Sequence, residues 1–278
     1  MGEYFGYKTV VSLSEDELAD FYQQRDENTV GCLTNEYLLI EDGKTGSIID
    51  QLKWSGDAFV EVPFKAIRSR NLGTIKPRNI HQRLLIDMLY DRNTTVKVTC
   101  GPYGSGKDML MIGAALDLIE KGVFDKIVWV RNNIEVADSK PIGHLPGSSF
   151  DKLLPYAMVI ADHVGGQDAL ERMIESGTIE LVHLGFIRGR DIKNAIVMCS
   201  EAENMTREHV QLLLGRIGEG SSLWLNGDFR QTDAQKFVRN NGLMTAIEKL
   251  KGHHRFGYVK LLKTERSETA AMADLLDE

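Results

Sequence analysis

The segment Gly101-Pro102-Tyr103-Gly104-Ser105-Gly106-Lys107-Asp108 has the residue types and spacing of a phosphate-binding loop. In the pattern G-x-x-x-x-G-K, glycines let backbone N–H groups surround the phosphates of a nucleotide, and the lysine neutralises the β- and γ-phosphates. The next residue is usually Ser or Thr, whose hydroxyl binds Mg²⁺. Here that residue is Asp108, so the segment predicts a nucleotide site with an altered metal position.

A second change follows the apolar run Ala195–Cys199, after which a carboxylate would complete the magnesium site. Here the run is followed by Ser200 and then Glu201, so the hydroxyl and the carboxylate have exchanged positions. Mg²⁺ takes about six oxygen ligands and usually keeps several waters. We favour a rewired site in which Asp108 binds the metal directly and Ser200 binds it through a water. The alternative is a damaged site that binds nucleotide without efficient hydrolysis.

Other polar residues could complete the catalytic machinery. Glu201 stands where a general base would orient the attacking water. Gln231, three residues after Asp228, suits a γ-phosphate sensor. Arg266 could stabilise charge on the γ-phosphate, acting across a subunit interface. The alternatives for these residues are a solvated acid at a strand end and an ordinary turn.

Two more groups of residues are candidates for binding. The first precedes the phosphate loop and could hydrogen-bond an adenine edge: Arg78, Asn79 and Gln82. The second follows predicted strands and could contact a nucleic-acid backbone: Arg131, Arg188 and Arg190.

From Asn79 onward, apolar strands alternate with helices, which predicts an α/β domain with a parallel sheet covered on both faces. The predicted strands are 95–100, 126–130, 178–184, 194–199, 222–226 and 257–262. One predicted helix begins at Asn79, and the other predicted helices cover 107–121, 150–164, 167–176, 206–217, 243–251 and 267–276. Ligands of such sheets bind at the carboxyl ends of the strands, where the phosphate loop, Ser200 and Asp228 are expected.

The first third of the chain has a different pattern. Ser14 is expected to cap a short helix over 14–24, because acidic residues fill the first turn that follows it. Three short segments, 37–40, 47–54 and 58–62, predict an antiparallel meander. We therefore predict a small α+β attachment over residues 1–74 and a nucleotide-binding domain over residues 75–278.

Composition limits the function classes. The chain has 278 residues and a net charge of −7, which argues against a protein that coats nucleic acid by bulk charge. Basic residues cluster between 65 and 97; they could face a polyanion, but a solvated surface is favoured. No C-x-x-C spacing occurs, so the cysteines predict buried thiols. No apolar stretch reaches the roughly 18–20 residues of a membrane span and no secretion signal is evident, so a cytoplasmic protein is expected.

Several motifs in order resemble the PhoH-like ATPases, relatives of superfamily 1 helicase cores. They are the segment 76–82, the phosphate loop, Gly143-His144-Leu145-Pro146-Gly147, Phe186-Ile187-Arg188-Gly189-Arg190, Ser200-Glu201-Ala202-Glu203-Asn204 and the segment 227–233. The family pattern has Asp and Gln where this chain has Ser200 and Glu203. The resemblance implies a P-loop NTPase core with a RecA-like parallel sheet, ATP and Mg²⁺ as cofactors, RNA binding or unwinding, and hexameric rings.

The first seventy residues are similar to the linker that joins a PIN ribonuclease domain to the PhoH core in two-domain members. The PIN domain has no counterpart here, so nuclease activity is not carried over. Our leading hypothesis is a Mg²⁺-dependent ATPase coupled to single-stranded RNA. The alternatives are a nucleotide-binding module that scaffolds RNA-processing partners without turnover, and a P-loop kinase, for which no lid or acceptor site is evident.

Overall fold

The computed structural model describes residues 3–12, 14–131, 154–231, 237 and 239–265. Its largest sheet has six strands in the order β12-β7-β11-β10-β8-β9, and all neighbouring strands run parallel. The strands are β7 (Val96–Cys100), β8 (Lys126–Arg131), β9 (Ile179–His183), β10 (Ala195–Cys199), β11 (Ser222–Gly227) and β12 (Phe256–Lys260). The predicted α/β class is confirmed, and all six predicted strands are present with ends that differ by at most two residues.

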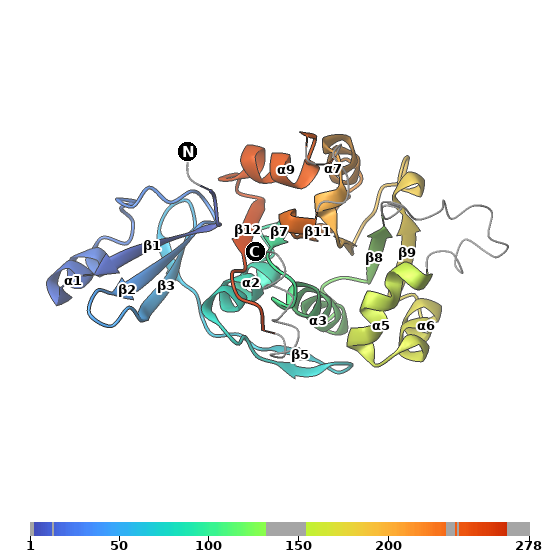
Figure 1. Ribbon diagram of the computed structural model, residues 1–278, viewed down its shortest axis with the longest axis horizontal. Helices are drawn as coiled ribbons and strands as arrows, with labels where there is room; N and C mark the ends of the chain where they lie inside the picture. Colours follow the sequence, from blue (N-terminus) through green and yellow to red (C-terminus); the bar gives the residue numbers. More distant parts are fainter. Residues whose placement is uncertain (1–2, 13, 132–153, 232–236, 238, 266–278) are drawn as a thin grey trace.

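Helices cover both faces of this sheet (Figure 1). One face carries α2 (Ile80–Tyr90), α3 (Lys107–Glu120), α5 (Met158–Val164) and α6 (Gln167–Glu175), and the other carries α7 (Arg207–Leu214) and α9 (Gly242–Leu250). Along β10, Ile196 and Met198 pack into the core on the side of α2, α3, α5 and α6. Val197 and Cys199 pack into the core on the side of α7 and α9. Because β10 is buried on both sides, its sequence is a continuous apolar run.

Capping explains where several helices begin. Asn79 is the N-cap of α2 and accepts a hydrogen bond from the N–H of Gln82 (3.0 Å), and Thr206 caps α7. Short 3-10 turns follow the strands at η2 (Leu184–Phe186), η3 (Ala202–Asn204) and η4 (Phe229–Gln231), and η1 (Leu154–Ala157) precedes α5. The predicted helix 267–276, Arg266 and the motif at 143–147 lie outside the described residues.

The N-terminal part forms a separate four-stranded sheet, ordered β1-β2-β3-β4. The predicted meander is confirmed as β2 (Tyr37–Asp42), β3 (Ile48–Trp54) and β4 (Phe59–Glu61), and Ser14 caps α1 (Glu15–Gln23). Strand β1 (Tyr7–Ser12) was not predicted, because its side chains are at most half-buried and give a weak pattern. A hairpin of β5 (Ile67–Ser69) and β6 (Gly73–Ile75) follows. The division of the chain between residues 74 and 75 stays a prediction.

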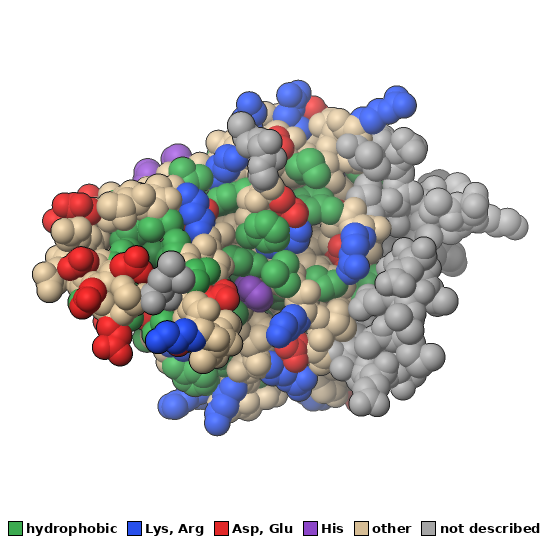
Figure 2. Space-filling view, turned by 60° about the vertical axis from the view of Figure 1, so that its left-hand side comes forward, with side chains coloured by type: hydrophobic (Ala, Val, Ile, Leu, Met, Phe, Trp, Pro, Cys, Tyr) green, Lys and Arg blue, Asp and Glu red, His purple; other side chains and the backbone are tan. Residues whose placement is uncertain are grey.

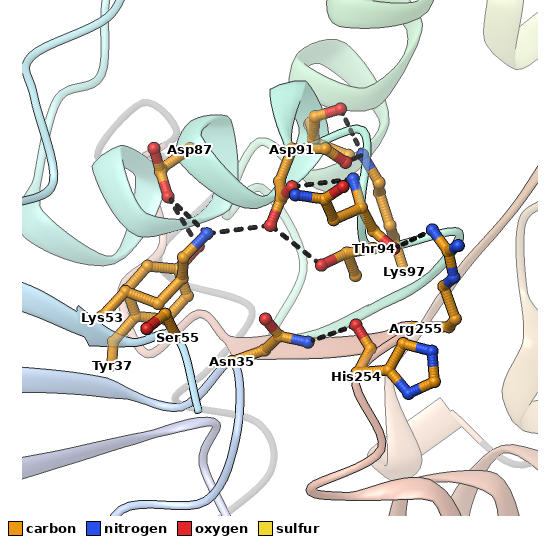
Figure 3. Close-up of polar contacts among 12 residues, drawn as sticks. Asn35, Tyr37, Lys53, Ser55, Asp87, Asp91, Thr94, Lys97, His254 and Arg255 are labelled. Carbon is orange, nitrogen blue, oxygen red and sulfur yellow. Dashed lines mark hydrogen bonds and ion pairs between the residues drawn. The ribbon is translucent and has the colours of Figure 1, made fainter. Parts of the chain in front are cut away.

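A network of polar contacts attaches the N-terminal sheet to α2 and to the start of β12 (Figure 3). The Asp87 carboxylate accepts a hydrogen bond from the Tyr37 hydroxyl (3.1 Å) and forms an ion pair with Lys65 (2.7 Å); Asp87 is 6% exposed. Lys53 of β3 forms an ion pair with Asp91 (2.8 Å). Asn35 donates its side-chain amide to the backbone carbonyl oxygen of His254 (2.9 Å). The sheet is therefore held at several polar points rather than by apolar packing alone.

We expect Asp87→Ala to lower the free energy of unfolding by about 3 kcal/mol, because it leaves the Lys65 ammonium and the Tyr37 hydroxyl without their buried partner. Urea denaturation followed by circular dichroism measures this change. The matched control is Glu61→Ala, which removes an exposed ion pair with Arg25 (3.3 Å) and should cost less than about 1 kcal/mol. Equal losses of unfolding free energy for the two variants would contradict a large contribution of this network to stability.

The surface does not present its charge evenly. Acidic side chains gather at one end of the face in Figure 2, whereas lysines and arginines are scattered over the rest of it, with hydrophobic side chains exposed between them. In this view, charge alone does not mark a nucleic-acid surface. Within the described ranges, none of the helices has the length and apolar character needed to cross a membrane.

Candidate nucleotide-phosphate site

The phosphate loop joins β7 to α3 at the carboxyl edge of the sheet, as predicted. Gly104 and Gly106 have positive φ angles of 63° and 87°, which favour glycine. A Cβ on Gly101 would lie 2.7 Å from the carbonyl oxygen of Leu261, so that position has no room for a side chain. The loop leads into the N-terminus of a 14-residue helix, where backbone N–H groups favour an anion.

Two side chains of the loop fit a phosphate ligand. The Lys107 ammonium donates hydrogen bonds to the carbonyl oxygens of Gly101 (2.6 Å) and Pro102 (2.9 Å), and burial lowers its pKa. The Ser105 hydroxyl is 1% exposed and has no hydrogen-bond partner within the described part of the chain. A buried hydroxyl without a partner costs about 1–3 kcal/mol, and a phosphate oxygen would supply one. The loop therefore fits a nucleotide.

The fold brings the exchanged residues Asp108 and Ser200 into contact. The Ser200 hydroxyl donates to Oδ1 of Asp108 (3.0 Å), across 92 residues of sequence. The Asn226 amide donates to the same oxygen (2.8 Å), from a position that is 2% exposed at the end of β11. One carboxylate and one hydroxyl beside the phosphate loop fit Mg²⁺, which keeps several waters. No group of three or more His, Cys, Asp or Glu that could hold a metal occurs in the ranges described, so water and phosphate would have to supply the other ligands.

Glu201 follows β10 with a positive φ of 56°, unusual for a residue with a side chain. Its carboxylate forms an ion pair with the Arg131 guanidinium, with 2.5 Å between Oε2 and Nη2. The parallel register of β10 and β8 aligns Cys199 with Val130, which brings Arg131 beside the residues that follow β10. The structure thus joins a predicted catalytic residue to a predicted RNA-binding residue.

Asp228 and Gln231 lie beside the loop with a buried partner that the sequence did not indicate. The side-chain amide of Gln231 donates to Oδ2 of Asp228 (2.8 Å), and the N–H of Asp228 donates to Oε2 of Glu203 (3.2 Å). Glu203 is 2% exposed. Burial, followed by repulsion from Glu201, raises its pKa to about 7, and Lys107 opposes the shift. Burial therefore disfavours the charged form of Glu203, and a neutral glutamine at this position would carry no such penalty.

We expect Glu203→Gln to stabilise the protein at pH 8 by about 2 kcal/mol relative to the wild type, and to have little effect near pH 4.5. The folded state holds a proton on Glu203 between pH 4.5 and about 7 that the unfolded state releases, so stability falls as pH rises through that window. Denaturant titrations at pH 4.5, 6 and 8 test this sign. Glu219→Gln, on the exposed surface, is the control. An effect of Glu203→Gln that does not change with pH would contradict the raised pKa of Glu203.

The predicted adenine-edge residues lie next to the loop but already have protein partners. Gln82 donates to the Ser105 carbonyl oxygen (2.9 Å) and accepts from the Arg78 N–H (2.8 Å). The Asn79 amide donates to the Glu265 carboxylate (2.7 Å), and Arg78 donates to the Glu265 carbonyl oxygen (3.0 Å). The N–H of Glu265 donates to Gly104 (2.9 Å), so the chain after β12 crosses the loop. The adenine contact stays a prediction.

The three predicted RNA-binding arginines are not all at one place. Arg131 contacts the candidate site, whereas Arg188 is exposed beyond β9 and Arg190 pairs with Glu180 (2.8 Å).

The basic cluster between residues 65 and 97 is not one solvated face. Its member Lys97 is 4% exposed and donates to two carbonyl oxygens at the end of α2, those of Leu89 (2.5 Å) and Asp91 (2.8 Å).

Comparisons with known proteins identify the relatives of this chain. The family model of the PhoH-like proteins matches residues 74–275. The chain is 32% identical to protein PhoH2 of Bacillus subtilis, over 98% of this chain and 64% of that protein. It is 36% identical to the PhoH-like protein of the same organism, over 59% of this chain and 52% of that protein. Among solved structures, it is similar to the Pif1 helicase of Candida albicans, with 16% identity and a TM-score of 0.40, over 73% of this chain and 44% of that one.

The chain therefore spans between half and two thirds of the length of these curated relatives. The family match covers the whole six-stranded sheet and the phosphate loop. On this basis, the chain belongs to the PhoH-like protein family.

Proposed function

We propose that this chain binds ATP with Mg²⁺, hydrolyses it, and couples hydrolysis to the binding or unwinding of single-stranded RNA. The observation that carries the proposal is the contact between Asp108 and Ser200 beside Lys107. The loop N–H groups and Lys107 hold the phosphates, and Asp108 and Ser200 hold the metal. Bound Mg²⁺ would neutralise charge on the β- and γ-phosphates.

The other residues act around this centre. Glu201 orients the attacking water, and Gln231, held by Asp228, senses the γ-phosphate. The ion pair of Glu201 with Arg131 supports the coupling to RNA. When an RNA phosphate takes over Arg131, the Glu201 carboxylate is released for catalysis. Arg266 acts from a neighbouring subunit of a ring-shaped hexamer, and the protein works in the cytoplasm.

The second candidate is a nucleotide-binding module that scaffolds RNA-processing partners without turnover. The same ion pair favours it, because a Glu201 carboxylate held permanently by Arg131 could not act on water. The two candidates differ in their dependence on the metal. Hydrolysis needs Mg²⁺ at Asp108, whereas a scaffold needs only the phosphate loop.

Calorimetric titration with ATP, with and without a chelator, combined with steady-state phosphate release, separates the two candidates. The ATPase proposal predicts that the chelator weakens ATP binding and that Lys107→Ala abolishes release of phosphate. Equal rates for the wild type and Lys107→Ala would refute hydrolysis. Unchanged affinity in chelator, together with no turnover, would establish the scaffold.

A further inference from the structure

Phe186 is the most exposed large hydrophobic side chain in the described ranges, at 69%. It ends the turn η2, in which Leu184 is 4% exposed, and the next residue, Ile187, is fully buried in the same core. Leu184 and Ile187 thus anchor the chain on both sides of Phe186, while the Phe186 ring stays exposed. A single exposed aromatic residue is ordinary, so its surroundings decide whether it binds anything.

The ring of His183 completes an aromatic corner with Phe186. The two ring centroids lie 5.6 Å apart at an interplanar angle of 64°, an edge-to-face arrangement. The N–H of Gly185 donates to Nδ1 of His183 (3.0 Å), which fixes the imidazole. A Cβ on Gly185 would lie 3.0 Å from that nitrogen, so glycine permits this close turn. The corner is therefore held in place rather than formed by loose surface side chains.

The corner lies beside the candidate site and among cations. In the parallel pairing of β8 with β9, His183 is the register partner of Arg131, and neighbouring strands lie about 4.8 Å apart. Arg188, two residues after Phe186, is exposed.

We propose that Phe186 and His183 form a stacking platform for a base of single-stranded nucleic acid, whose backbone runs past Arg188 to Arg131. This inference rests on the proposed coupling to RNA and names residues that carry it. A flat apolar ring beside guanidinium groups matches a ligand that presents a base face and a phosphate together. A duplex hides its base faces in the stack, so the platform selects single strands. Base stacking is tolerant of sequence because every base has such a face.

The test is binding of a fluorescein-labelled oligouridylate to the full chain, measured by fluorescence anisotropy at fixed salt. We expect Phe186→Ala and Phe186→Leu to weaken binding about tenfold or more, and Phe186→Trp to retain it. Leucine keeps an apolar side chain but lacks the ring, so weaker binding by Phe186→Leu would distinguish base stacking from a simple hydrophobic contact. An oligonucleotide with one 2-aminopurine should show fluorescence quenching with the wild type that is lost with Phe186→Leu. Met244→Ala, on the exposed surface of α9, is the control.

The failures of the two proposals are distinguishable. If Arg131→Gln weakens binding but Phe186→Ala does not, the RNA function stands and the platform is wrong. If the wild type binds neither oligonucleotide, the RNA part of the proposed function falls with it. If Phe186→Ala changes the oligomeric state in size-exclusion chromatography but not the affinity for RNA, the ring is a subunit contact and the platform is refuted.

Discussion

Asp108→Asn is expected to lower the rate of ATP hydrolysis at least about 100-fold, equivalent to about 2.7 kcal/mol of transition-state stabilisation. Asparagine keeps the size of the side chain and an oxygen that can accept from Ser200 and Asn226. It removes the negative charge that the proposed metal site requires. Steady-state phosphate release measured over a range of Mg²⁺ concentrations should show both the lower rate and a weaker dependence on the metal.

Two further variants sharpen this result. Asp125→Asn, an exposed residue before β8, should hydrolyse ATP like the wild type. The double variant Asp108→Thr with Ser200→Asp restores the common order of hydroxyl and carboxylate. If the native site is rewired, the double variant should stay within about tenfold of the wild type, because the ligand inventory is the same. A steep rise from a near-zero wild-type rate would mean that the native site is the damaged one.

Glu201→Gln is expected to lower turnover about 10²- to 10⁴-fold, the range that a general base contributes. ATP affinity should stay unchanged, because the side chain lies beyond the phosphate loop and pairs with Arg131. Single-turnover hydrolysis and calorimetric binding, measured on the same preparation, separate the two quantities. A parallel loss of affinity and rate would contradict a role confined to the attacking water.

The partner of Glu201 gives the complementary result. Arg131→Gln should raise hydrolysis in the absence of RNA and abolish its stimulation by RNA, because the carboxylate is no longer held. Arg131→Lys, which keeps a cation at this position, is the matched control and should retain stimulation. If Arg131→Gln has the wild-type rate both with and without RNA, the ion pair does not couple the two sites.

The sequence predicted those parts of the fold that depend on local pattern. The apolar run of β10, the Asn79 cap and the glycine spacing of the loop are each set by neighbouring residues. The contact of Asp108 with Ser200 was expected because the carboxyl ends of parallel strands meet at one edge. Strand β1 escaped prediction because pairing along β2, rather than its own pattern, stabilises it.

The missed site residues are polar groups whose role depends on distant partners. Asn226 interrupts an otherwise apolar strand, and that interruption was the available signal for its contact with Asp108. Glu203 and Glu265 carried no such signal, because a glutamate near a helix or at a chain end is usually solvated. Their partners, Asp228 and Asn79, lie 25 and 186 residues away in sequence, so only the tertiary fold brings them together.

Helix α2 has both of its ends fastened. Its first turn bonds to the phosphate loop through Gln82 and Ser105 (2.9 Å), and its last turns hold the N-terminal sheet through Asp87 and Asp91. Eleven residues of helix make a stiff rod about 16 Å long. If phosphate binding tilted this helix, the N-terminal sheet would move with it, because the sheet is attached to the other end of the helix. Through α2, hydrogen bonds and ion pairs thus connect the N-terminal sheet to the phosphate loop.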